Sequence, residues 1–172
     1  TQVSAQTPES VTLVVNVTKD ATVGPRDVVI GGVVKPAAIA VYDRIDYIKV
    51  GPEWAMARLG GVTFPKGFAR FEATAFHNGR DGRSNTGDDV QIGLVDATWS
   101  LEEYGVTYDD DDIRFVGTLD QTGLFTPNLD GPNPSRSANR NNIGDVWVVA
   151  SYQPPDKSVR PLKARAHLVV TV

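Results

Sequence analysis

The sequence of 172 residues contains no cysteine, and this absence excludes several kinds of chemistry from the chain. Without thiols the chain forms no disulfide, offers no thiolate nucleophile and cannot ligate zinc or an iron–sulfur cluster through sulfur. A covalently attached c-type haem needs a Cys-x-x-Cys-His sequence, so none can be attached within this chain. We therefore expect no cofactor chemistry that depends on cysteine.

Long apolar runs and clusters of positive charge are also missing. No window approaches the roughly 20 apolar residues of a transmembrane helix, so we expect no membrane insertion. Lysine and arginine number 17 against 21 aspartates and glutamates, and the cations do not gather in the stripe that binds a phosphate backbone. We therefore expect no nucleic-acid partner. The chain begins at Thr1 with neither an initiating Met nor a signal segment, and we expect it to be trimmed by export or by excision.

Helical periodicity is absent as well, whereas alternation of apolar with other residues recurs along the chain. The alternation is clearest at residues 162–172, where every second residue from Leu162 to Val172 is apolar. Alternating or β-rich runs predict further strands at residues 11–17, 27–30, 39–42, 47–50, 54–59, 68–77, 90–95, 98–101, 113–116, 124–126 and 146–152. Turn residues such as Asn78-Gly79 and Asp81-Gly82 separate these runs. The sequence therefore predicts an all-β fold, and the strand number and spacing favour an Ig-like antiparallel β-sandwich.

The length indicates more than one such module, because a typical Ig-like sandwich has roughly 100 residues. The run at residues 47–50 ends in Gly51-Pro52, and a strand does not easily continue its hydrogen-bond ladder through proline. We place a domain boundary there. The three runs before it are too few for a sandwich of their own, whereas the runs after it suffice for one. Large aromatic side chains inside the predicted strands are interpreted as core rather than as a ligand-stacking platform: Trp54, Phe71, Trp99, Phe115, Phe125 and Trp147.

A glycine-rich acidic segment at residues 78–89 is a candidate metal site. Asp81, Asn85, Asp88 and Asp89 place hard oxygen ligands, the type that calcium requires, in one loop. The spacing lacks the alternating carboxylates and terminal Glu of an EF-hand. A solvated hairpin connection, in which Asp and Asn cap turns, is therefore the favoured interpretation, with calcium as the alternative.

Three other features were weighed for chemistry or binding. Residues 109–112 are four successive carboxylates, which could attract a cation or simply be solvated. His77 and His167 are the only histidines, and without a Gly-x-Ser-x-Gly elbow a hydrolase is only a formal alternative. Residues 128–142, rich in Pro and Asn, are long for a structureless loop, which indicates either partner docking or an ordered Ω-loop.

Several short segments resemble known families. Segments Phe71–Ala75, Ala97–Ser100, Gly123–Pro127 and Gly144–Ala150 resemble bacterial Ig-like domains of surface and periplasmic proteins. A more specific resemblance, over most of the chain, is to the C-terminal part of the alpha subunit of quinohaemoprotein amine dehydrogenase. It is carried by segments Ala21–Val28, Val41–Asp46, Pro52–Arg58, Gly131–Pro134 and residues 78–89.

This resemblance implies a domain organisation and a setting. Residues 1–46 would be the C-terminal half of an Ig-like (IPT/TIG-like, E-set) sandwich, and residues 47–172 a complete Ig-like domain. The family is periplasmic and deaminates primary amines oxidatively. Its c-type haems lie in a dihaem cytochrome part and its protein-derived quinone on a small subunit, so both would be partners of this chain. No residue here matches a catalytic or haem-binding position. We expect a fragment or separate chain of that assembly, or a fold reused without redox chemistry.

The leading hypothesis is therefore a non-catalytic docking module with no active site of its own. Trp54, Arg136 and Arg140 are the interface candidates, because aromatic residues and arginine are enriched at interface hot spots. The alternative hypothesis is a free-standing secreted or cell-surface Ig-like binding module, stiffened by calcium through Asp81 and Asp88–Asp89.

Overall fold

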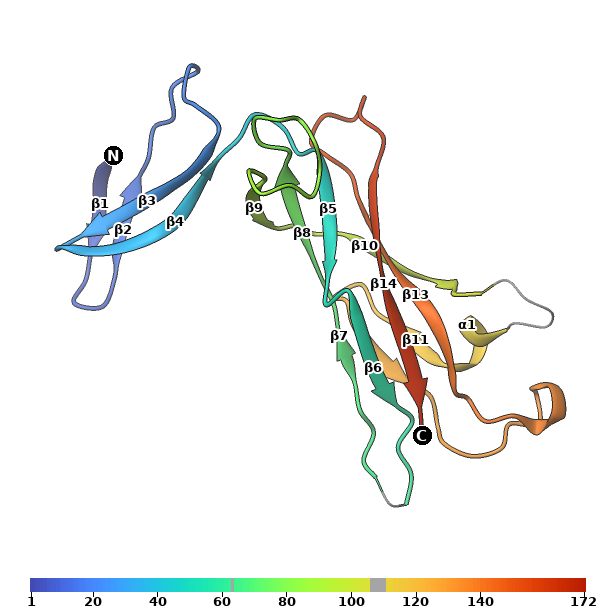
Figure 1. Ribbon diagram of the computed structural model, residues 1–172. Coiled ribbons are helices and arrows are strands. Elements are labelled where there is room, and N and C mark those ends of the chain that lie inside the picture. The colour runs from blue at the N-terminus through green and yellow to red at the C-terminus, as the bar shows by residue number, and fades with distance from the viewer. Residues whose placement is uncertain (63, 106–110) are drawn as a thin grey trace. The chain divides into compact units, whose positions relative to one another are not determined.

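Strands make up nearly all of the regular structure, as the all-β prediction requires. The computed structural model describes residues 1–62, 64–105 and 111–172 (Figure 1). It divides the chain into two units, Thr1–Asp43 and Arg44–Val172. The strand pairs are antiparallel except for one, and the arrangement agrees with the expected Ig-like sandwich. None of the helices in the described part of the chain has the length and apolar character needed to cross a membrane.

The first unit consists of two small antiparallel sheets. Strands β1 (Gln2–Gln6) and β2 (Val11–Val14) form one pair, and β3 (Gly24–Ile30) and β4 (Val33–Val41) form the other. No apolar side chain in residues 1–43 is buried, and Gly24 is the only buried residue there. A groove of about 390 Å³ is lined by Leu13, Val28, Ile39 and Val41 among others. This unit therefore has apolar faces but no core of its own.

The second unit is built from three sheets. The strands are β5 (Tyr47–Gly51), β6 (Trp54–Arg58), β7 (Ala69–Arg70), β8 (Glu72–His77), β9 (Val90–Leu94), β10 (Thr98–Glu103), β11 (Gly117–Leu119), β12 (Leu124–Pro127), β13 (Gly144–Tyr152) and β14 (Leu162–Thr171). The sheet orders are β10-β13-β14-β6, β5-β8-β9 and β11-β12-β7, and β6 pairs with β14 in parallel. A turn of α-helix, α1 (Asp112–Phe115), and a 3₁₀ turn, η1 (Ser137–Asn139), complete the unit.

The core of the second unit collects side chains from all three sheets. Phe71 and Phe125 are almost fully buried, and Trp99, Val148 and Leu168 join them from the four-stranded sheet. The alternation predicted for residues 162–172 is confirmed in β14, where Ala166, Leu168 and Val170 are buried. Burying a Leu or Phe side chain contributes about 1.5–3 kcal/mol, so this cluster is what holds the sandwich together.

Some predicted elements were wrong or incomplete. Of residues 113–116, expected as a strand, residues 113–115 belong instead to the helical turn α1, and Val116 caps its C-terminal end by donating its N–H to the Asp112 carbonyl at 2.9 Å. The Asp112 side chain is held by Arg136, 24 residues away, so local periodicity could not indicate this turn. The run at residues 68–77 is split into β7 and β8, which belong to different sheets. Strand β1 was missed.

Candidate functional site

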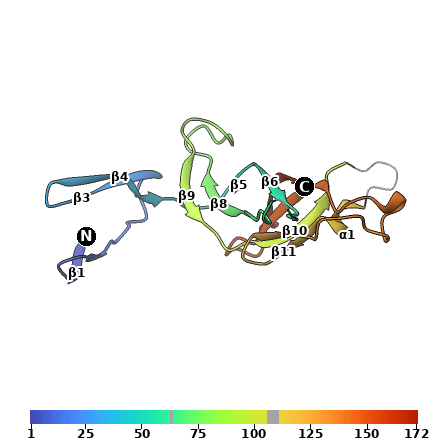
Figure 2. The ribbon, with the colours of Figure 1, turned by 90° about the horizontal axis from the view of Figure 1, so that it is seen from below.

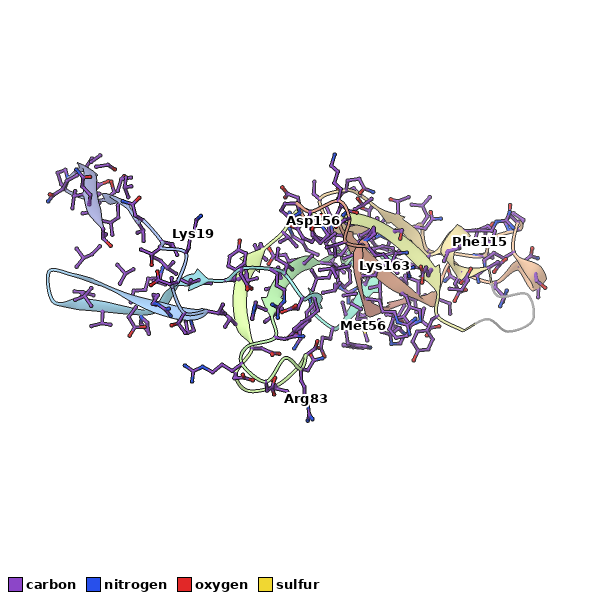
Figure 3. The ribbon with its side chains drawn as sticks, turned by 90° about the horizontal axis from the view of Figure 1, so that it is seen from above. Lys19, Met56, Arg83, Phe115, Asp156 and Lys163 are labelled. Atoms are coloured by element: carbon purple, nitrogen blue, oxygen red, sulfur yellow. The ribbon has the colours of Figure 1, made fainter. Side chains whose placement is uncertain are left out.

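The loop between β8 and β9, the acidic segment at residues 78–89, is closed by hydrogen bonds to its own carboxylates. It projects from its sheet in Figure 2, and Arg83 lies on its outer side in Figure 3. Asp88 Oδ2 accepts the backbone N–H groups of Arg80 at 2.6 Å and Asp81 at 3.1 Å. A Cβ at Gly79, where φ is +64°, would lie 2.3 Å from the Asp88 carbonyl oxygen, so glycine permits this close approach.

Asp89 joins the same loop to strand β5. The Tyr47 hydroxyl donates to Asp89 Oδ2 at 2.5 Å, and the Thr86 N–H donates to the same oxygen at 3.0 Å. The bond from Tyr47 lowers the pKa of Asp89. Burial, and then the bond to Asp89, raise the pKa of Tyr47 to about 12. The Asp89 carboxylate is therefore committed to donors of the protein itself.

The remaining candidate calcium ligands, Asp81 and Asn85, also take part in turns of the loop. Asp81 Oδ1 accepts the Arg83 N–H at 2.8 Å, and Asn85 adopts a left-handed φ of +65° that suits a turn. Over residues 1–62, 64–105 and 111–172, no group of three or more His, Asp or Glu side chains is arranged to hold a metal ion. The geometry supports a hydrogen-bonded hairpin connection, and calcium binding stays a prediction.

The two histidines lie on different sheets of the second unit. His77, on β8, is buried; its Nδ1 accepts the Gly79 N–H at 3.0 Å and lies 3.9 Å from Asp46 Oδ2. Burial raises the pKa of Asp46, but hydrogen bonds from the Asn78 N–H and from Arg44 outweigh it and bring the pKa below its ordinary value. His167, on β14, has Nε2 2.9 Å from Asp145 Oδ2. The contact of His77 with Asp46 links β8 to the segment before β5, and the contact of His167 with Asp145 links β14 to β13. Both histidines therefore have a structural role.

Arg136 lies at the centre of a buried ion-pair cluster. One of its terminal nitrogens donates to Asp112 at 2.5 Å and to Asp111 at 3.0 Å, and the other donates to the carbonyls of Asn141 and Ile143, each at 2.8 Å. Its guanidinium also lies over the ring of Phe115, the last residue of α1, which Figure 3 labels. Arg136 is only 4% exposed, so its side chain offers little surface to another chain, and its place at an interface stays a prediction.

Arg136 is buried because the nearby carboxylates draw it inward. Buried arginine is tolerated where its charge is paired, and here both terminal nitrogens also donate hydrogen bonds. Arg140 is different, because its side chain is 47% exposed although it lies 3.3 Å from Asp111. Arg140 stays an interface candidate. Of the acidic run at residues 109–112, Asp111 and Asp112 belong to this cluster, and Asp109 and Asp110 lie outside the described residues.

Trp54 lies on the outer face of the four-stranded sheet rather than in the core. Cross-strand pairing places Glu102, Trp147, His167 and Trp54 in one row across β10, β13, β14 and β6. Tyr104 stacks on His167 with ring centroids 3.9 Å apart. Trp54, at the end of this row, is 53% exposed. The prediction that it belongs to the core was therefore wrong, and it stays an interface candidate.

Residues that sequence analysis did not single out contact the side chains of this row. Tyr104 and Asp145 hold His167 from two sides, and Arg165 lies over the Trp147 ring at 4.3 Å. The period-2 alternation places Arg165 and His167 on one face of β14, but it gives no sign of which rings on other strands meet them. Only strand pairing brings them together.

Comparison with protein families identifies the relatives of both units. Residues 48–172 match the family model described as "Quinohemoprotein amine dehydrogenase, alpha subunit domain IV". Residues 1–43 match the model for domain III of the same subunit. The chain belongs to this family. No curated protein matches the chain.

The two matches to the quinohaemoprotein amine dehydrogenase alpha subunit fit the division of the structure. The domain III match ends at residue 43, where the first unit ends, and the domain IV match begins at residue 48, just inside the second unit. The segments that carried the resemblance in sequence are distributed over both units. The family assignment from sequence is confirmed.

Proposed function

We propose that this chain is a non-catalytic docking part of a periplasmic quinohaemoprotein amine dehydrogenase. The matches to alpha-subunit domains III and IV over both units carry this proposal. In the whole complex, which removes the amino group of primary amines oxidatively, other parts supply the redox centres. This chain contributes β-sandwich surfaces that hold those parts in position.

The residues present do not fit the family's redox cofactors. Covalent attachment of c-type haem requires two cysteines and a histidine in a fixed spacing, and the sequence has no cysteine. Of the two histidines, His77 is buried beside Asp46, and His167 is engaged by Asp145 and Tyr104. Covalently attached haem is therefore assigned to a partner, the dihaem cytochrome part, and the resemblance to the family assigns the protein-derived quinone to the small subunit.

Isolation of the native assembly tests this proposal. The chain is captured from its native source under mild conditions, and the eluate is analysed by visible absorption, quinone staining and native mass spectrometry. We expect a c-type Soret band together with a small quinone-bearing chain in a complex of fixed stoichiometry. A colourless monomer would contradict the proposal and favour the free-standing Ig-like module. A parallel capture with an unrelated protein that carries the same tag identifies partners that bind non-specifically.

A further inference from the structure

The hairpin that joins β6 to β7 protrudes from the second unit. We call its described residues, 59–62 and 64–68, the β6–β7 arm. Figure 1 shows the arm extending past the ends of both strands. Val62 is fully exposed, and Phe64 and Phe68 are each 57% exposed. Large apolar side chains gathered on a protrusion typically mark an interaction site.

Internal contacts stabilise the described residues of the arm. The N–H and carbonyl of Arg58 bond Gly67 at 3.0 and 2.9 Å, and the Gly61 N–H donates to the Phe64 carbonyl at 2.8 Å. Arg58 Nε donates to the Pro65 carbonyl, and its guanidinium lies over the Phe64 ring at 5.4 Å. Lys66 Nζ donates to the Pro127 carbonyl at 2.8 Å and so ties the arm to β12. Each contact formed before docking reduces the conformational entropy that docking would cost.

The exposed apolar residues continue from the arm along β6. Trp54 and Met56 are both more than half exposed, and they alternate with the more buried residues of that strand. The apolar surface therefore runs from Trp54 along the strand to Phe64. A membrane would engage only the protruding end, whereas a partner protein can cover the whole length. The shape favours a protein.

The charge of this segment indicates the chemistry of that protein. Between Glu53 and Glu72 the sequence contains Arg58, Lys66 and Arg70 but no carboxylate, in a chain whose net charge is −4. Asp130 lies at the base of the arm, near Gly61, and accepts a hydrogen bond from Asn141. A cationic, apolar protrusion is complementary to an apolar pocket rimmed by carboxylates.

We infer that the β6–β7 arm inserts into an apolar pocket rimmed by carboxylates on another subunit of the amine dehydrogenase. This inference rests on the proposed function, and the family's description of an alpha subunit implies that other subunits exist. Phe64 and Val62 fill the pocket, and the net positive charge of the segment between Glu53 and Glu72 is attracted to its carboxylate rim. Trp54 and Met56 extend the contact along β6.

Affinity measurements with variants of the full chain test the inference. Subunits of the native complex, freed of this chain, are immobilised, and the dissociation constants of Val62→Glu, Val62→Lys and Phe64→Ser are compared with that of the unmodified chain. Leu94→Ser is the matched control, because Leu94 is 66% exposed on β9 of the same unit. Thermal unfolding of each variant verifies that these exposed substitutions leave the fold intact.

We expect Val62→Glu and Phe64→Ser to weaken binding by about 30-fold or more, as truncation of a hot spot does. Val62→Lys removes the same apolar surface but keeps the favourable charge, so it should bind more tightly than Val62→Glu. Leu94→Ser should bind like the unmodified chain. Equal binding by all variants would overturn the inference and leave the proposed function standing.

Other outcomes identify a different occupant. Equal weakening by Val62→Lys and Val62→Glu would exclude the acidic rim. Arm-dependent sedimentation with phosphatidylglycerol vesicles would assign the arm to a membrane, and arm-dependent self-association in ultracentrifugation would assign it to a second copy; either overturns the inference. If the unmodified chain does not bind the subunits at all, the proposed function fails and the inference fails with it.

Discussion

At the scale of single residues, a few polar side chains join segments that are distant in sequence. Arg136 joins the loop at residues 128–142 to the start of α1, and Asp112 in turn accepts the Asp145 N–H at 2.9 Å. Tyr47 joins β5 to the loop at residues 78–89 through Asp89. In each case a buried or half-buried group finds its partner more than 20 residues away.

Replacing Arg136 with Leu should lower the free energy of unfolding by about 3–5 kcal/mol, because removal of one partner leaves a buried charge uncompensated. Arg140→Leu, at a side chain that is 47% exposed, should cost about 1 kcal/mol or less. Urea denaturation followed by tryptophan fluorescence measures both values. Equal costs for the two variants would show that burial of Arg136 does not decide its contribution.

Stability at alkaline pH should depend on Tyr47. The pKa of its phenol is raised from the ordinary 10 to about 12 in the folded chain. The neutral phenol therefore contributes stability that is fully present below pH 10 and is lost as the pH rises through 12. Tyr47→Phe should lessen the fall in unfolding free energy above pH 10 and remove a step near pH 12 from an ultraviolet tyrosinate titration. Identical alkaline profiles would contradict this.

At the scale of elements, side chains form hydrogen bonds with backbone groups that strand pairing leaves without a partner strand. Strand β10 pairs with β13 on one side, and on its other side the Gln121 amide accepts the Trp99 N–H and donates to the Trp99 carbonyl, each at 3.0 Å. The side chain thus occupies the place of a neighbouring strand at that point. Blocked edges resist unwanted pairing with other chains.

The loop at residues 78–89 is an element stabilised by its own donors, and we expect calcium to leave its stability unchanged. Asp88 and Asp89 accept N–H and O–H donors, so a cation would have to compete with these donors for the carboxylate oxygens. Melting temperatures in millimolar calcium and in chelator should therefore agree. A rise in calcium that Asp88→Asn abolishes would establish the site and favour the free-standing binding module.

At the scale of the whole molecule, the two units differ in how much apolar surface they bury. The second has a core drawn from three sheets, whereas the first has none. A pair of strands without a core is marginally stable in water. The assignment of residues 1–46 as the C-terminal half of a sandwich stays a prediction, and the lack of buried apolar residues supports it.

Hydrogen exchange of the full chain should reveal this difference. Amides of β1 to β4 should exchange much faster than those of β13 and β14, because local opening exposes them without disrupting a core. The protection of β13 and β14 serves as the internal reference. Comparable protection in both units would mean that the first unit is stabilised by contacts beyond those it makes with itself.

Much of the fold follows from local pattern, but the candidate site does not. Alternation predicted β14 with its correct buried face, and the aromatic residues Phe71, Trp99 and Phe125 were correctly expected in the core. The same rule failed for Trp54, because alternation defines two faces of a strand without saying which face another sheet covers. The burial of Arg136 could not be predicted either, because its acidic partners are distant in sequence.

The sequence by itself determined the all-β class, the family and the exclusion of covalently bound haem, because these depend on periodicity, on local segments and on the absence of cysteine. Tertiary structure alone decided that Arg136 is buried, that Trp54 is exposed and that the acidic loop closes on its own donors. These outcomes depend on contacts between residues far apart along the chain. Such contacts form only when the sheets assemble, so no local pattern encodes them.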